Sequence, residues 1–254
     1  MLSRTRLAAV VGALALTLPL AACGDDDNGG GDTTTLQVLA ASSLTDVFGD
    51  FGKQFEADHD GVKVEFSFGS STDLAAQAAD GAPGDVLATA DQDSMTSAQD
   101  AGVVTGDPAN FATNVLVLVT PPDNPAGITS LADLDGATWV RCADEAPCGK
   151  VALAVLDAQH VTAQPASLED DARSTLDKVT SGEADAALVY ASDAQSAGDS
   201  VKTIPIAGAE GQQTSYYIAP LDQSGDADLA QQFTDLVTGP DGQQALAGAG
   251  FGKP

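Results

Sequence analysis

The chain is short of positive charge and of aromatic side chains, and each shortage excludes something. Ten Lys and Arg residues stand against 37 Asp and Glu among 254 residues, a formal charge of −27 at pH 7. A charge of this sign repels nucleic acid, so nucleic acid is not a predicted partner. Aromatic residues make up 5% of the chain and hydrophobic residues 43%. The core is therefore expected to be close-packed and built mainly from small side chains.

The chain also has no hydrophobic run long enough to span a bilayer. Its longest mostly apolar run lies near the N-terminus. Residues 7–20 form a mostly apolar run of 14 residues, shorter than the ~20 residues that span a bilayer. The run follows Arg4 and Arg6 and ends at Leu20-Ala21-Ala22-Cys23, a pattern typical of a bacterial lipoprotein signal. We predict that residues 1–22 are a signal peptide and that acylated Cys23 anchors the protein to the extracytoplasmic face of the cell membrane. An ordinary signal peptide with an incidental cysteine is the alternative.

Cysteine and histidine are too few for most metal and redox sites. Besides Cys23 the chain has Cys142 and Cys148, and its two histidines, His59 and His160, lie in unrelated segments. No second cysteine pair is present, so a metal centre is the weaker interpretation of Cys142 and Cys148. Because an exported chain meets an oxidising environment, we predict a disulfide between them. Chain entropy makes the closure of so short a loop worth about 2 kcal/mol.

The motifs of common enzyme classes are absent as well. The sequence contains no Gly-x-Ser-x-Gly elbow, no histidines at metal-binding spacing, no Gly-x-Gly-x-x-Gly and no phosphate-loop lysine. A serine triad would need His59 or His160 beside Ser43 or Ser71. We therefore predict no catalytic residues and no cofactor, and a binding protein rather than an enzyme.

What the sequence does contain is a recurring unit of strand, serine turn and helix. Residues 36–40 form an apolar strand that stops at Ser42 and Ser43, and apolar residues then recur at helical spacing through residues 44–55. Serine at such a junction is an N-cap candidate. Helix N-termini also bind anions, through free N–H groups and the helix dipole. The sequence at this point therefore allows either a simple cap or a ligand site.

The unit repeats, which favours the ligand site. Residues 62–68 alternate as a strand, Ser70 and Ser71 follow, and residues 74–79 form a helical run. Residues 85–89 and 91–101 add a further strand and helix. Alternating strands and helices predict an α/β fold with a parallel sheet, whose ligands bind at the carboxyl ends of the strands. Both serine turns fall there, so two hydroxyls and two helix ends are expected to face one anion.

The second half of the chain continues the pattern. Residues 114–120 are an unbroken apolar strand that we expect to carry the chain from one lobe to a second. Ser167 with Asp170 resembles a capping box that opens a helix. The main remaining expectations are a strand at 138–142 with Trp139 as a packing residue, a helix at 151–160 after the Ala146–Lys150 turn, a strand at 186–190, an edge strand at 201–206, a strand at 216–219 that returns to the first lobe, and closing helices from residue 226.

Five separated motifs resemble the periplasmic molybdate-binding proteins of ABC importers, over about residues 35–252. They are residues 41–46, 68–71, 81–86, 188–194 and 250–252. The resemblance implies a two-lobed periplasmic-binding-protein fold of type II, each lobe a mostly parallel sheet flanked by helices, with the ligand in the cleft. Residues 35–113 and 214–254 would form lobe 1 and residues 114–213 lobe 2. Residues 23–34, rich in Gly and Asp, would be a flexible tether.

The resemblance also implies the ligand and its site. Ser43, Ser71 and Tyr190 would donate hydroxyl hydrogens to the oxyanion, and main-chain amides would donate at Ser43, Ser71, Cys148 and Ala172, with Asp171 the alternative to Ala172. The ligand would be molybdate or tungstate, captured by hinge closure of a monomer and delivered to an ABC permease. Arg173 is expected to form a structural salt bridge. Sulfate, phosphate or another small solute in the same fold is the alternative.

Overall fold

The computed structural model describes residues 33–254. The predicted signal peptide, Cys23 and most of the predicted tether lie outside these residues. Between residues 33 and 254 no helix is long and apolar enough to cross a membrane.

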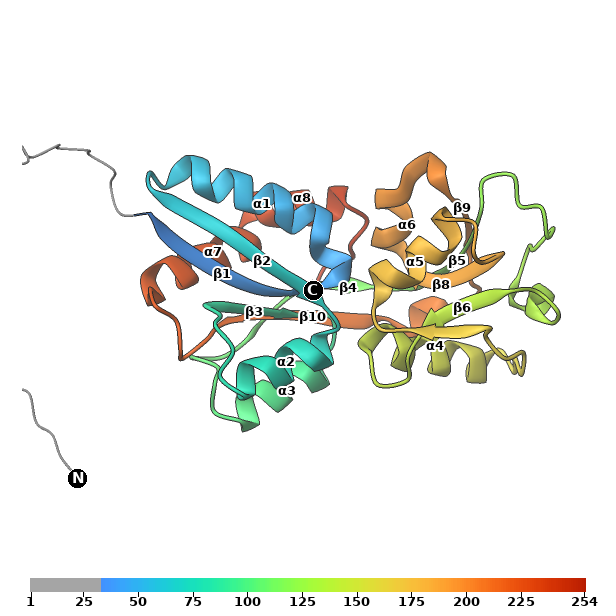
Figure 1. Cartoon of the computed structure of the whole chain (residues 1–254), viewed down its shortest axis with the longest axis horizontal. Helices are drawn as coiled ribbons and strands as arrows, with labels where there is room; N and C mark the ends of the chain where they lie inside the picture. The colour runs from blue at the N-terminus through green and yellow to red at the C-terminus, as the bar shows by residue number, and fades with distance from the viewer. Residues whose placement is uncertain (1–32) are drawn as a thin grey trace, which may run out of the picture. The chain divides into compact units, whose positions relative to one another are not determined.

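The described residues form two five-stranded sheets, and we call each sheet with its helices a lobe (Figure 1). The strand order in lobe 1 is β2-β1-β3-β10-β4, and in lobe 2 it is β7-β6-β8-β5-β9. Lobe 1 contains β1 (Thr34–Ala41), α1 (Thr45–Asp58), β2 (Val62–Gly69), α2 (Ser71–Ala79), β3 (Val86–Thr89), α3 (Gln92–Asp100), β4 (Ala109–Asn114), β10 (Thr214–Pro220), α7 (Ala227–Thr238) and α8 (Pro240–Gly248). Lobe 2 contains β5 (Leu116–Thr120), β6 (Trp139–Cys142), α4 (Pro147–Ala158), β7 (Ser167–Glu169), α5 (Ala172–Thr180), β8 (Ala186–Tyr190), α6 (Ala191–Ala197) and β9 (Lys202–Pro205). Short 3-10 turns complete the fold at Ser42–Leu44 (η1), Leu131–Leu134 (η2), Gly198–Ser200 (η3) and Ala209–Gln212 (η4).

Both sheets are mixed. In lobe 1, β1 is parallel to β2 and β3, while β10 is antiparallel to β3 and β4. In lobe 2, β6 is parallel to β7 and β8, while β5 is antiparallel to β8 and β9. The parallel pairs have crossover helices, as the sequence predicts. The antiparallel strands are those at which the chain passes from one sheet to the other.

Helices cover both faces of each sheet (Figure 1), and the cores lie between the layers. In lobe 1, α1, α7 and α8 cover one face, where Phe48 packs its ring against Phe51, Phe111 and Phe233. The few aromatic residues of the chain are therefore concentrated in one core. In lobe 2, α4 covers the face that buries Trp139, which is 0% exposed, while α5 and α6 cover the other. Trp139 is a packing residue, as predicted.

Two local predictions are wrong. Residues Ser167–Glu169 are strand β7, paired in parallel with β6, and do not open a helix. Helix α5 begins instead at Ala172, with Asp171 as its N-cap accepting from the Ser174 amide. Two features outweigh the local pattern: β7 finds backbone partners on β6, and Asp171 with Ser174 forms a capping box at the start of α5.

The serines of the first unit do not cap a helix through their side chains. Ser42 and Ser43 form the 3-10 turn η1, and neither its N-cap nor that of α1 has a side-chain hydrogen bond. The predicted strand at 114–120 is also divided: Asn114 ends β4 in lobe 1 and Leu116 begins β5 in lobe 2. The chain therefore changes sheets at Val115.

Candidate functional site

A small cavity between the lobes is lined by the ends of several strands and the first turns of several helices. From lobe 1 it takes the end of β1 with η1, the end of β2 with α2, and the residue after β3; from lobe 2 it takes the first turns of α4 and α5 and the end of β8. The cavity volume is about 10 Å³, far below the ~300–1,000 Å³ typical of pockets for organic ligands. Its lining residues are Ala41, Ser42, Ser43, Gly69, Ser70, Ser71, Ala90, Pro147, Cys148, Asp171, Ala172 and Tyr190.

The cavity brings together all five residues that the sequence singles out, although they come from five separate segments. Ser71 and Ala172 are the first residues of α2 and α5, and Cys148 is the second residue of α4. Ser43 lies in η1, and Tyr190 precedes α6. The first amides of a helix have no acceptor within it, and the helix dipole favours negative charge there. The arrangement is therefore suited to an anion.

The Ser43 hydroxyl is oriented by groups behind the cavity. The Asn114 amide nitrogen lies 3.4 Å from the Tyr216 hydroxyl, which lies 2.8 Å from Ser43 Oγ. Because an NH₂ group can only donate, Tyr216 accepts from Asn114 and is free to donate its own hydrogen to Ser43. Ser43 then keeps its hydrogen for a ligand. Burial raises the pKa of Tyr216, so the phenol stays protonated.

The other two hydroxyls are also prepared to donate. Ser71 is 1% exposed and its Oγ accepts from the Ala90 amide at 2.9 Å, which leaves the Ser71 hydrogen available. Tyr190 is 1% exposed, and its hydroxyl has no hydrogen-bond partner within the described residues. Burial raises the pKa of Tyr190 well above its usual value, so this hydroxyl keeps its proton. A buried hydroxyl without a partner costs about 1–3 kcal/mol, a cost that an accepting ligand removes.

The carboxylates near the cavity are occupied by helix caps. Asp171 lines the cavity, but its Oδ1 accepts from the Ser174 amide at 2.9 Å. Asp193 is 1% exposed and its Oδ2 accepts from the Tyr190 amide at 3.0 Å. Burial raises the pKa of Asp193 to about 7, against the lowering effect of that amide and of Arg173. No Lys or Arg is among the lining residues, so the cavity offers uncharged donors.

A disulfide shapes the turn that carries Cys148. Cys142 at the end of β6 is bonded to Cys148 in α4, with 5.7 Å between their Cα atoms, as the sequence predicts. Gly149 follows, and a Cβ there would lie 1.7 Å from the Ala143 carbonyl oxygen. Only glycine fits this close approach. The first turn of α4 is therefore held in place on one wall of the cavity.

Several residues of the site are not among those predicted from the sequence. Ser42 and Ser70 lie beside the predicted serines and also line the cavity; the paired serines were the available signal. Asn114 and Tyr216, which orient Ser43, carry no sequence signal, since 102 positions separate them. Within residues 33–254 neither histidine lines the cavity, and no cluster of three His, Cys, Asp or Glu side chains could hold a metal ion.

Comparison with known proteins identifies the family. The model of the bacterial extracellular solute-binding protein family matches residues 36–252. The chain belongs to this family. This solute-binding protein is 41% identical over 219 residues to the molybdate-binding protein ModA of Mycobacterium tuberculosis strain H37Rv, an alignment that covers 85% of this chain and 84% of that protein.

Solved structures of similar fold accompany this relative. The periplasmic molybdate-binding protein of Azotobacter vinelandii matches with a TM-score of 0.77 at 20% identity, covering 86% of this chain and 99% of that one. The substrate-binding domain of a putative molybdenum ABC transporter from Clostridium difficile matches with a TM-score of 0.66 at 24% identity. The match covers 87% of this chain and 100% of that one. The sulfate-binding protein SubI of M. tuberculosis H37Rv matches with 0.73 at 20%, covering 86% of each chain. The predicted two-lobed periplasmic-binding-protein fold is confirmed.

Proposed function

We propose that this solute-binding protein captures molybdate, or tungstate, in the cavity between its lobes and delivers it to an ABC importer. The observation that carries the proposal is the set of uncharged donors around a small cavity between the lobes. The 41% identity to the mycobacterial molybdate-binding protein supports the choice of ligand. The match to a domain of a putative molybdenum ABC transporter supports delivery to an importer.

Neutral donors are sufficient for a dianion if every oxygen is hydrogen-bonded. Burying such a charge without partners would be prohibitive, whereas hydrogen bonds to a charged acceptor are the stronger class. In our proposal the hydroxyls of Ser43, Ser71 and Tyr190 donate to the oxyanion. Main-chain amides at Ser43, Ser71, Cys148 and Ala172 donate as well, and the dipoles of the helices behind them add to the attraction. The acidic surface repels an approaching anion, but salt at about 0.15 M screens charges beyond about 8 Å.

Calorimetric titration of the purified protein tests the proposal. Molybdate is expected to bind with a stoichiometry of one, and Ser71→Ala combined with Tyr190→Phe should reduce the affinity by more than tenfold, since two hydrogen bonds to a charged group are lost. Ser97→Ala combined with Tyr217→Phe is the matched control, because Ser97 is exposed on α3 and Tyr217 lies outside the cavity. Unchanged molybdate affinity in the first variant would rule out the assigned site.

Sulfate is the second candidate, favoured by the structural likeness to a sulfate-binding protein. Both ions are tetrahedral dianions, so the same donors would serve either, and the size of the closed cavity would decide between them. Competition separates the candidates. If sulfate at equal concentration displaces bound molybdate, sulfate is the ligand of this cavity; if it requires a large excess, molybdate is.

We also propose that the protein is a monomeric lipoprotein on the extracytoplasmic face of the membrane, acylated at Cys23 after removal of residues 1–22. The lipoprotein pattern at residues 20–23 supports this. Expression of Cys23→Ser in a bacterial host should move the protein from the membrane fraction to the soluble fraction. Mass spectrometry of the membrane-bound protein should show an N-terminal cysteine that carries acyl chains. Recovery of the variant in the membrane fraction would contradict the anchor.

A further inference from the structure

Two cations of lobe 2 form ion pairs with carboxylates of lobe 1. The chain has only ten Lys and Arg residues, and eight of them lie in residues 33–254. Lys150 of lobe 2 contacts Asp91 and Asp93 of lobe 1, at 2.8 Å and 3.4 Å. Arg173 of lobe 2 forms an ion pair with Asp46 of lobe 1, which also confirms the structural salt bridge expected for this arginine. Because the chain is strongly acidic, these pairs oppose a general repulsion between the lobes.

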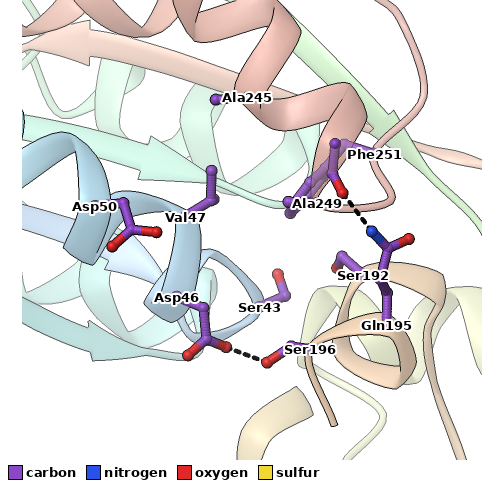
Figure 2. Close-up of a pocket in the computed structure, with 11 residues that line it drawn as sticks. Ser43, Asp46, Val47, Asp50, Ser192, Gln195, Ser196, Ala245, Ala249 and Phe251 are labelled. Atoms are coloured by element: carbon purple, nitrogen blue, oxygen red, sulfur yellow. Dashed lines mark hydrogen bonds between the residues drawn. The ribbon is translucent and has the colours of Figure 1, made fainter. Parts of the chain in front are cut away.

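The Asp46 contact joins three helices. Asp46 lies in the first turn of α1 and accepts from Arg173 of α5 and from the Ser196 hydroxyl of α6. Figure 2 shows Asp46 and Ser196 facing each other across the groove between the lobes, with Gln195 reaching the end of α8, where it donates to the Gly248 carbonyl. The Ser196 and Arg173 hydrogen bonds lower the pKa of Asp46 against the effect of its partial burial. This carboxylate therefore stays ionised and keeps both partners.

The Lys150 contact joins α4 to α3. Its main partner, Asp91, is the N-cap of α3 and its side chain is 12% exposed. Beside this pair, Thr72 of α2 donates to the Glu145 carbonyl at 2.9 Å. The Lys150 side chain is 38% exposed, so solvent screens this pair in part. A direct cation-to-carboxylate contact nevertheless links lobe 2 to a fixed helix end of lobe 1.

Each cation lies in the same helical turn as a proposed ligand donor. Lys150 is two residues after Cys148 in the first turn of α4, and Arg173 directly follows Ala172 in α5. The Arg173 amide itself lies 3.3 Å from Ser42 Oγ across the cleft. Neither cationic side chain lines the cavity. An anion pulling on the amides of these turns would therefore bring the two cations onto their carboxylates in lobe 1.

We propose that Lys150 and Arg173 are positioning residues that clamp the lobes together over the bound anion and set the rate of its release. This inference rests on the proposed function, because it assigns the clamps to the same site. The two cations hold the lobes closed and do not contact the ligand. The release of the anion can therefore depend on Lys150 and Arg173 although neither residue lines the cavity.

The test compares clamp variants with a matched control. Lys150→Met and Arg173→Met are each expected to speed the release of radiolabelled molybdate by about 1.4- to fivefold, and the double variant by about two- to 25-fold, from the range measured for exposed ion pairs. Lys178→Met is the control. The substitution removes the same charge, but Lys178 pairs with Glu183 inside lobe 2 and does not join the lobes. Release is followed by a chase with excess unlabelled molybdate. Added salt should speed release from the wild type and the control but change the double variant less.

Rescue and scattering separate a clamp from a general loss of structure. Arg173→Lys should restore most of the slow release, and the charge-exchanged protein Asp46→Arg with Arg173→Asp should release more slowly than either single variant. Without ligand, the double clamp variant should have a larger radius of gyration in X-ray scattering than the Lys178→Met control. Equal release rates in the double variant and the control would overturn the inference. If the wild type binds no oxyanion, the proposed function fails. The clamps are rejected separately if the double clamp variant and the Lys178→Met control have equal radii of gyration without ligand.

Discussion

Tyr216 lies outside the cavity but orients a hydroxyl group that lines it. Its hydroxyl links Asn114 to Ser43, at 3.4 Å and 2.8 Å, and the link leaves the Ser43 hydrogen free for an acceptor. Tyr190 and Ser71 reach the same state by other means: the Tyr190 hydroxyl has no partner among residues 33–254, and Ser71 accepts from the Ala90 amide. At the scale of single residues, the site is defined by the direction in which hydroxyl groups donate.

Tyr216→Phe is therefore expected to weaken oxyanion binding without removing a lining residue. The Ser43 hydroxyl would lose the donor that orients it, at a cost of about 1 kcal/mol, or roughly fivefold in the dissociation constant. Calorimetric titration measures the effect, with Tyr217→Phe as the control because Tyr217 is partly exposed in the same strand. An equal effect of both substitutions would show that the link through Tyr216 does not orient Ser43.

Asp193 makes a pH-dependent contribution to stability. Burial raises its pKa to about 7 in the folded protein, against about 4 for an aspartate in an unfolded chain. Between these values the folded form holds a proton that the unfolded form has lost, so this group's contribution to the free energy of unfolding falls as pH rises from about 4 to about 7. Above pH 7 the contribution is constant.

Asp193→Asn removes that titration. Urea unfolding at pH 4.5 and pH 7.5 measures the change in the free energy of unfolding as pH rises. This change should be less negative, or more positive, for the variant than for the wild type. Other carboxylates titrate equally in both proteins and cancel in the difference. Asp199→Asn, at an exposed position in η3, is the control. A pH dependence that is the same in Asp193→Asn and the wild type would contradict the assigned pKa.

At the scale of elements, the site is a set of helix starts held at the ends of strands. The first turn of α4 is the most constrained of them, because the disulfide joins it to β6 and Gly149 lies against the Ala143 carbonyl. The turn places the Cys148 amide on the cavity wall. Its rigidity should therefore matter for stability and for the preorganisation of the site.

Removing the disulfide by Cys142→Ser with Cys148→Ser should lower the melting temperature. The loop is worth about 2 kcal/mol, which corresponds to roughly 4–8 °C for a domain of this size. Calorimetry of the variant beside the wild type under oxidising conditions measures the shift. Reduction of the wild type should reproduce it, and reduction of the variant should have no effect. A melting temperature that is the same with and without the bond would contradict this contribution.

At the scale of the whole molecule, the ligand and the clamps act on the same closed arrangement. Two acidic lobes meet at a cavity lined by uncharged donors. The cationic side chains of Lys150 and Arg173 in lobe 2 contact carboxylates of lobe 1. A ligand held by both lobes should stabilise the protein as a unit. At a free concentration of 100 times its dissociation constant, molybdate should add about 2.7 kcal/mol and raise the melting temperature by roughly 5–10 °C. Thermal unfolding with molybdate and with chloride checks this, and equal melting temperatures would contradict binding to the folded state.

Most elements could be predicted from the sequence because their apolar periodicity is strong. Strands β1, β2 and β8 and helices α1 and α7 lie within a few residues of their predicted positions. The failures lie where tertiary pairing outweighs local preference: β7 forms where a capping box was read, because the edge of β6 offers it hydrogen-bond partners. Strand β4 was missed for the same reason, since residues 109–114 pair with β10 from the far end of the chain.

The sequence alone determined most of the segments that begin helices after strands, and each helix start has free amides wherever it is placed, because those amides belong to the local backbone. Local pattern therefore places Ser43 and Ser71 at such starts, whereas Cys148, Ala172 and Tyr190 were expected from the family resemblance. Tertiary structure decided what those residues can do. The direction of the Ser43 hydroxyl depends on Asn114 and Tyr216, and closure depends on carboxylates that meet Lys150 and Arg173 only after two separate sheets have formed. Such contacts join positions far apart in the chain, and no local pattern encodes them.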